Sequence, residues 1–200
     1  MVANPYSNEV RYSLGLMLHH LDAARPRRVR LATHCVEMAR SAARFLCHSQ
    51  LTLEVESATI RDALGEIPKV AAEVRDPQRS PADAALFPFS LEEGLRPAGE
   101  PLLVAASYNG LSYKRLLYPR QRRPGIFATM AALRPAYCTQ PLAGLYSPRF
   151  ILGLALAKML EGRDSARYFA QEDRTMRRLI DTGPLWRFSY IVIFTGHRTA

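Results

Sequence analysis

Two clusters of basic side chains have the residue types and spacing best suited to ligand binding. The first falls at a predicted hairpin end and in a loop bounded by prolines, so we expect its side chains to be exposed. The second falls where a helix is expected to begin, although cations are unfavourable there. Arginine's planar fork suits bidentate phosphate contacts. The candidate nucleic-acid or anion-binding residues are Lys114, Arg115, Arg120, Arg122 and Arg123 in the first cluster, and Arg25, Arg27, Arg28 and Arg30 in the second. The competing interpretation of the first cluster is a solvated loop, or a salt-bridged contact with the acidic segment 50–100.

The cysteines and histidines indicate no catalytic pair. Cys35, Cys47 and Cys138 are odd in number, and no CxxC motif occurs. The neighbours His34–Cys35 and Cys47–His48 fall on one predicted helix, where adjacent side chains point in different directions. We therefore expect buried, unreactive free thiols and a reducing, cytoplasmic location.

Two carboxylate pairs, Glu54/Glu56 and Glu92/Glu93, are the remaining candidates for acid–base or metal chemistry. Glu54 and Glu56 share one face of a predicted strand, and a solvent-facing strand edge explains them more simply. The sequence has no phosphate loop, no dinucleotide glycine fingerprint, no GxSxG and no HExxH. It therefore predicts no catalytic residue, no cofactor and no metal site.

An aromatic stripe follows one face of a strand expected over residues 185–195. Its members are Trp186, Phe188, Tyr190, Val192 and Phe194. Single-strand nucleic-acid binders stack bases on such a surface. Aromatic residues on one strand face are more often core, and we expect core here.

Charge is unevenly distributed along the 200 residues. The net charge is +9, segment 101–160 contributes +8 without a single acidic residue, and segment 50–100 contributes −5. A strong positive field attracts polyanions or anionic membrane surfaces. Of the 27 basic residues only Lys69, Lys114 and Lys158 are lysines, a bias that a GC-rich genome would also produce.

Length and composition indicate one globular domain over residues 1–200. Hydrophobic residues make up 48% and charged residues 22%, which excludes a wholly disordered chain and a small disulfide scaffold. The longest dense apolar run, 150–160, is about half of what a bilayer crossing needs.

Hydrophobic periodicity predicts an irregular order of helices and strands. Helices are expected over 8–24, 27–48, 58–75, 148–160 and 165–181, and strands over 51–56, 102–107, 111–118 and 185–195. Asn109-Gly110 between two apolar runs predicts a hairpin turn with positive φ. Segment 76–101 has five prolines and is expected to be an irregular acidic connection. Residues 126–133 fit a strand or a short helix, and 134–146 a loop. This order favours an α+β fold in which a small, mainly antiparallel sheet packs with about five helices.

Three functions are compatible with these features. The leading hypothesis is a non-enzymatic, arginine-rich protein that binds RNA or another polyanion and self-associates. A viral coat, matrix or accessory protein found in a virion would fit this description. The opposite charges of segments 50–100 and 101–160 permit head-to-tail contact in a homo-oligomer. The first alternative is a peripheral membrane protein that binds anionic lipid through the same arginines. The second is an enzyme whose site is assembled from scattered residues.

Overall fold

The computed structural model describes residues 8–46, 51–91, 94–112, 125–148, 180–181 and 183–199. The chain divides into two compact units. The first comprises Met1–Ser107, Leu133–Gln140 and Phe194–Ala200, and the second comprises Tyr108–Ala132 and Pro141–Ile193. Each unit is described by itself below, and the single-domain expectation stays a prediction.

The first five strands along the chain are parallel and form one side of the sheet. They are β1 (Arg28–Leu31), β2 (Thr52–Val55), β3 (Ala71–Val74), β4 (Ala84–Pro88) and β5 (Leu102–Tyr108). β1 pairs with β2 on one side and with β4 on the other, β2 also pairs with β3, and β4 also pairs with β5. Most residues of β1, β2, β4 and β5 are buried, as is typical of parallel strands covered on both faces.

Antiparallel strands complete the sheet, which has the order β3-β2-β1-β4-β5-β8-β6-β7 over the described residues. These are β6 (Tyr137–Leu145), β7 (Ile180–Asp181) and β8 (Ile191–Arg198), and β6 pairs with β7 in the antiparallel sense. The N–H of Arg198 donates to the carbonyl of Pro101, and that of Asn109 donates to the carbonyl of Tyr190. β8 therefore runs opposite to β5. The sheet is mixed and mostly parallel, so the expected small antiparallel sheet is wrong.

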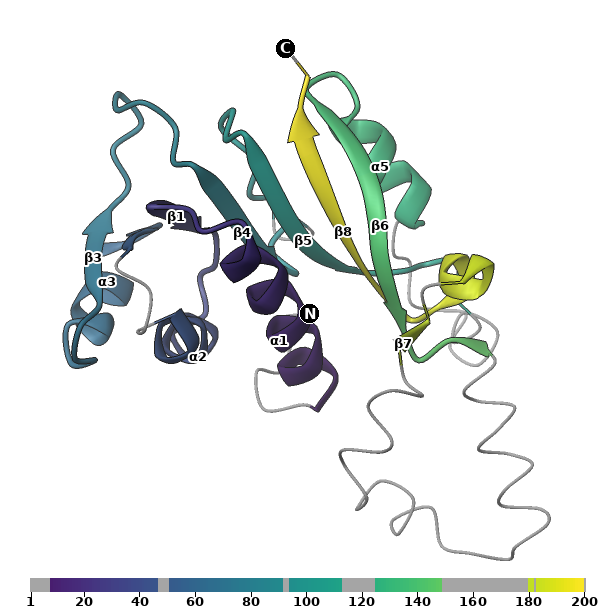
Figure 1. Cartoon of the computed structure of the whole chain (residues 1–200), viewed down its shortest axis with the longest axis horizontal. Coiled ribbons are helices and arrows are strands. Elements are labelled where there is room, and N and C mark those ends of the chain that lie inside the picture. The colour runs from purple at the N-terminus through teal and green to yellow at the C-terminus, as the bar shows by residue number, and fades with distance from the viewer. Residues whose placement is uncertain are drawn as a thin grey trace, which may run out of the picture. The chain divides into compact units, whose positions relative to one another are not determined.

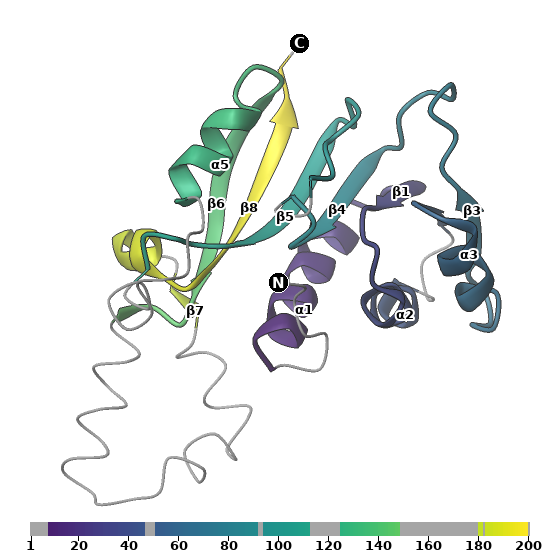
Figure 2. The same cartoon turned by 180° about the vertical axis from the view of Figure 1, so that it is seen from behind.

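Three helices of the first unit lie on one side of its strands (Figures 1 and 2). α1 (Asn8–Ala23) packs on α2 (Val36–Leu46) and on β4, and α2 packs on α3 (Ala58–Leu64). Ser57 caps α3, because its hydroxyl accepts a hydrogen bond from the N–H of Ile60 at 3.3 Å. The helices α2 and α3 provide the crossovers that parallel strands require.

The other crossovers of the first unit are connections without a described helix. Residues 75–83 join β3 to β4, and the described part of 89–101 joins β4 to β5. The first connection is held to β1, because the Asp83 carboxylate accepts hydrogen bonds from the N–H groups of Arg27 and Arg28 at 2.9 and 3.0 Å. These connections matter for the site, because they contact polar side chains of β1.

In the second unit, Asn109 joins three backbone segments. Its amide Nδ2 donates to the carbonyls of Arg187 and Ser189, and its Oδ1 accepts from the N–H groups of Leu111 and Ile126. The residue is buried and holds α5 (Ile126–Leu133) and the 3₁₀ helix η1 (Pro184–Phe188) to the end of β5. Neither Asn109 nor Gly110 has a positive φ, so the predicted hairpin turn is wrong.

Several expected elements differ from the observed ones. The helix over 8–24 and the strands over 51–56 and 102–107 are confirmed. The expected helix 27–48 is instead β1 followed by α2, 58–75 contains α3 and β3, and 76–101 contains β4. Residues 134–146 contain β6 rather than a loop, and the expected strand 185–195 begins as η1. Most residues of the predicted strand 111–118 and of the helices 148–160 and 165–181 lie outside the described residues.

Candidate functional site

The order of the parallel strands reverses between β1 and β4, which makes this the switch point of the sheet. From β1 the chain continues to β2 and β3 on one side, while β4 and β5 lie on the other. In open sheets of this kind, ligands bind beyond the carboxyl ends of the strands at the switch point. The segments that follow β1, β2 and β4 therefore define the candidate site.

The loop after β1 is a short turn that leads directly into α2. The buried hydroxyl of Thr33 accepts a hydrogen bond from the N–H of Cys35 at 3.1 Å, and α2 begins at Val36. No glycine occurs between Pro26 and the end of α2. A pyrophosphate needs glycines here for close approach to the backbone. This loop therefore does not fit a dinucleotide.

The segment after β4 closes over the same loop. The buried hydroxyl of Ser90 donates to the carbonyl of Ala32, the first residue after β1. Phe89 precedes it with a φ of 67°, in the left-handed region that side chains other than glycine seldom adopt. Its N–H donates to the carbonyl of Ala106 at 3.0 Å. Hydrogen bonds therefore hold the strand ends together at the switch point, and no sequence motif predicts them.

Glu56 places a carboxylate at the carboxyl end of β2. One oxygen accepts a hydrogen bond from Nε of Arg30 at 2.8 Å, and the other lies 3.9 Å from a guanidinium nitrogen of Arg75. An acidic residue about 20 residues after the β1–α2 loop binds ribose hydroxyls in nucleotide-binding sheets. Glu56 has that place in the sequence and in the fold, and its second oxygen keeps acceptor capacity.

Arg30 lies at the centre of a buried ionic cluster. Its guanidinium also donates to Glu100 at 3.0 Å and to the carbonyl of Arg96 at 2.8 Å, and it lies 5.2 Å from the centre of the Phe87 ring. The exposed fraction of the Arg30 side chain is 2%, and that of Glu100 is 1%. The cluster thus joins Glu56 to the β4–β5 connection.

The second predicted anion-binding cluster is therefore divided by the structure. Arg28 and Arg30 both form ion pairs on the sheet, Arg28 with Glu54 and Arg30 with Glu56 and Glu100. Both guanidinium groups are engaged in these ion pairs, and anion binding by the two arginines stays a prediction. Glu54 and Glu56 do share a face, as predicted, but they pair with these arginines instead of facing solvent. The residues of the first basic cluster, Lys114, Arg115, Arg120, Arg122 and Arg123, lie outside the described residues, as do Glu92 and Glu93.

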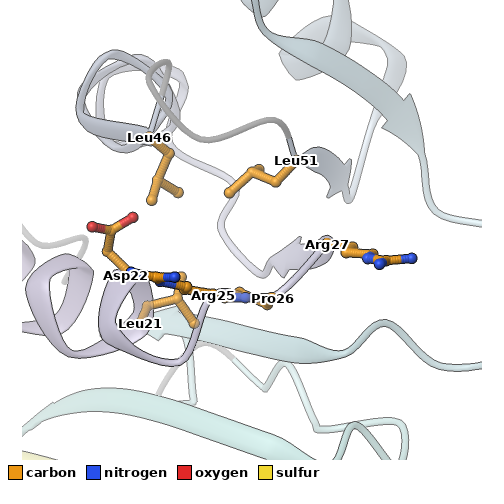
Figure 3. A pocket seen from close by; sticks show the side chains of 7 residues that line it. All are labelled: Leu21, Asp22, Arg25, Pro26, Arg27, Leu46 and Leu51. Atoms are coloured by element: carbon orange, nitrogen blue, oxygen red, sulfur yellow. The ribbon is translucent and has the colours of Figure 1, made fainter.

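Arg25 and Arg27 lie near the amino ends of the strands, at the other end of the sheet from the switch point. They are beside a cavity of about 300 Å³ (Figure 3). The cavity lies between the end of α1, the end of α2 and the amino ends of β1 and β2. Leu21, Leu46, Leu51 and Pro26 provide its apolar lining, and Asp22 completes it. The cavity is thus separate from the switch point.

The described thiols and acidic groups form no further site. Cys35 is half-buried and Cys138 is exposed, both as free thiols, so the expected burial is wrong for both. Among the described residues, no group of three or more His, Cys, Asp or Glu side chains is arranged to hold a metal ion. No helix in the described ranges is both long and apolar enough to cross a bilayer.

His20 gives the first unit a pH dependence. Burial lowers the pKa of His20, and the positive charges of His197 and His19 lower it further. The unfolded chain therefore binds this proton more readily, and the stability that neutral His20 gives is complete above the ordinary histidine pKa of about 6.5 and lost as pH falls below it. We expect urea unfolding to show that the free energy of unfolding falls less between pH 7.5 and pH 5.5 for His20→Gln than for the parent. An equal loss in both proteins would contradict this.

Comparison with solved structures places the fold among methyltransferase domains. The chain is similar to the methyltransferase domain of bacterial CtHen1-C, with a TM-score of 0.50 and 11% identity over 96% of this chain and 100% of that one. It also aligns with the MccD protein (TM-score 0.49, 9% identity, 94% and 97% covered) and with the plantazolicin methyltransferase BpumL (TM-score 0.46, 13% identity, 98% and 86% covered). No protein-family model matches the chain, and no curated protein matches it.

The fold corrects the functional expectation. The sheet resembles that of a methyltransferase domain, and this likeness in fold speaks against the expected non-enzymatic RNA-binding or viral structural protein. The alternative of an enzyme assembled from scattered residues is the one that the fold favours. The sequence had missed this because its strands are short and no glycine motif marks the β1–α2 loop. RNA or membrane partners, self-association and a cytoplasmic location stay predictions.

Proposed function

We propose that this chain is a methyltransferase that uses S-adenosylmethionine, with the adenosine part bound at the carboxyl ends of β1 and β2. The observation that supports this most directly is Glu56 at the end of β2, in a mostly parallel sheet whose order reverses beside it. The fold likeness to a methyltransferase domain supports methyl transfer as the reaction class.

The residues present fit this cofactor better than a dinucleotide. S-adenosylmethionine has a ribose but no phosphate, so it needs a carboxylate for its hydroxyls and no glycine cradle. Glu56 provides that carboxylate. The cofactor would supply a methyl group bonded to a sulfonium. Glu56 would accept hydrogen bonds from the ribose hydroxyls. The segment after β4 is hydrogen-bonded to the loop after β1 and forms the boundary of the site there. Thr33 and the other side chains of the loop make close backbone approach harder, so affinity should depend strongly on Glu56.

Titration calorimetry with S-adenosylhomocysteine, the demethylated product, tests the proposal. We expect the parent to bind and Glu56→Gln to lose about tenfold or more in affinity, because hydrogen bonds to a charged acceptor contribute about 1.5–3 kcal/mol. Circular dichroism should show that the variant is folded.

The matched control is Glu100→Gln, which removes the other carboxylate bound to Arg30. It disturbs the same cluster without touching the end of β2, and it should bind S-adenosylhomocysteine within about threefold of the parent, less than the smallest loss expected at Glu56. No binding by the folded parent would overturn the proposal. Equal losses in both variants would show that the cluster matters only for folding.

A further inference from the structure

β3 is the outer strand of the first unit, and one of its two edges is unpaired among the described residues. The sheet order begins at β3, which pairs with β2, and Figures 1 and 2 show it at the outer edge. The N–H of Arg75, directly after β3, donates to the carbonyl of Val55 at 2.9 Å. Successive N–H groups along a strand point to opposite sides, so those of Ala72 and Val74 point away from β2. Such an edge is a template for pairing with another strand.

The side chains at this edge are apolar on one face of the sheet and charged on the other. Val74 is aligned with the buried Val55, and its exposed fraction of 39% is high for a valine in a strand. Glu73 is aligned with Glu54, on the face that has the ion pairs, and Arg75 shares that face because it is two residues further on. The side chains of Glu73 and Arg75 are 51% and 27% exposed. The edge therefore presents an apolar side chain between two opposite charges.

Two copies of this edge are complementary to each other in one antiparallel register. A two-fold axis at Val74 places Glu73 opposite the partner's Arg75, and by symmetry it forms this pair twice. It also brings the two Val74 side chains together, and the outward N–H and carbonyl of each Val74 can exchange hydrogen bonds. An axis at Glu73 or at Arg75 would instead place like charges directly opposite, which is destabilising. Among axes at residues 72–75, only the one at Val74 opposes unlike charges.

We propose that this protein forms a two-fold homodimer in which β3 pairs with β3 of a second copy. The contact is isologous, unlike the head-to-tail contact expected from the segment charges. Glu73 is already paired with Arg79 at 2.6 Å, and Arg75 lies 3.9 Å from Glu56, but exposed pairs contribute little and rearrange readily. β3 has four residues, so the interface is small and the dimer should dissociate on dilution. The dimer is independent of the proposed methyl transfer.

Sedimentation velocity of the full chain over a concentration series tests the dimer, which should form with a Kd below about 0.5 mM. Val74→Pro is the informative variant, because proline removes an N–H that faces away from β2 and leaves the pairing with β2 intact. It should weaken association at least tenfold, since both symmetric hydrogen bonds are lost. Val74→Ile keeps the N–H and the branched apolar side chain, so this matched control should stay within about threefold of the parent. Thermal melting should show that both variants are folded.

Charge reversal tests the same interface without changing the backbone. Glu73→Arg and Arg75→Glu should each weaken self-association, because each places like charges opposite one another. An equimolar mixture of the two variants should associate at least as tightly as the parent, since every opposed pair is then unlike. A parent that stays monomeric up to about 0.5 mM, as it would if the edge served only an extended peptide, would overturn the dimer. A dimer that Val74→Pro leaves unchanged, or that mixing does not restore, would overturn β3 as its interface.

Discussion

Replacing Arg30 with methionine should lower the free energy of unfolding by about 3–5 kcal/mol, the usual cost of removing one partner of a buried ion pair. Methionine has a similar length and packs well, so the loss comes mainly from charge. The substitution leaves the carboxylates of Glu56 and Glu100 without their shared cation, and Glu100 is almost fully buried. Urea unfolding at pH 7, followed by circular dichroism, measures the loss.

Two further measurements separate this electrostatic loss from poor packing. Protonation neutralises a carboxylate that has lost its cation, so the deficit of Arg30→Met should shrink as pH is lowered. The triple variant with Glu56→Gln and Glu100→Gln should recover part of the stability, because no buried charge remains unpaired. A loss below about 1 kcal/mol for the single variant would mean that the cluster is well solvated.

The sequence predicted the long helix well and the short strands poorly. α1 has a regular apolar period over four turns, which indicates a helix without tertiary help. β1 and β3 were absorbed into predicted helices, because their residues also fit the helical patterns expected over 27–48 and 58–75. β4 was missed because prolines surround it, and the parallel pairing that fixes the fold is a contact between distant segments.

The sequence singled out arginines and glutamates of the candidate site, but it did not predict what each of them contacts. Charged side chains are seldom fully buried unless they are paired, and the sequence does not indicate which acidic residue pairs with Arg30. The partner Glu100 lies 70 residues from Arg30 in sequence, and only the fold brings the two together. One signal was present: arginines alternate with apolar residues over 28–31, and glutamates do so over 53–56. Two such complementary segments indicate neighbouring strands joined by cross-strand ion pairs.

Phe87→Ala should cost about 3–5 kcal/mol, the range for removing a fully buried aromatic side chain. Phe87 has no exposed surface, and it lies in β4 on the face that includes Arg30. The substitution opens a cavity beneath the guanidinium and removes the ring that it faces. Phe87→Leu, which keeps more of the apolar volume, should cost clearly less in the same urea titration.

The contact between the ring and the guanidinium predicts that the two largest losses are not additive. Residues in contact show interaction energies of about 0.5–3 kcal/mol, and a cation over an aromatic face contributes about 0.5–2 kcal/mol. The double variant Phe87→Ala with Arg30→Met should therefore lose less than the two single losses combined, because each change already removes the shared contact. Urea unfolding of the four proteins in this cycle measures the coupling. Strict additivity would show that Phe87 supports the sheet only as apolar volume and that the ionic cluster is held in place by Glu56, Glu100 and the carbonyl of Arg96 alone.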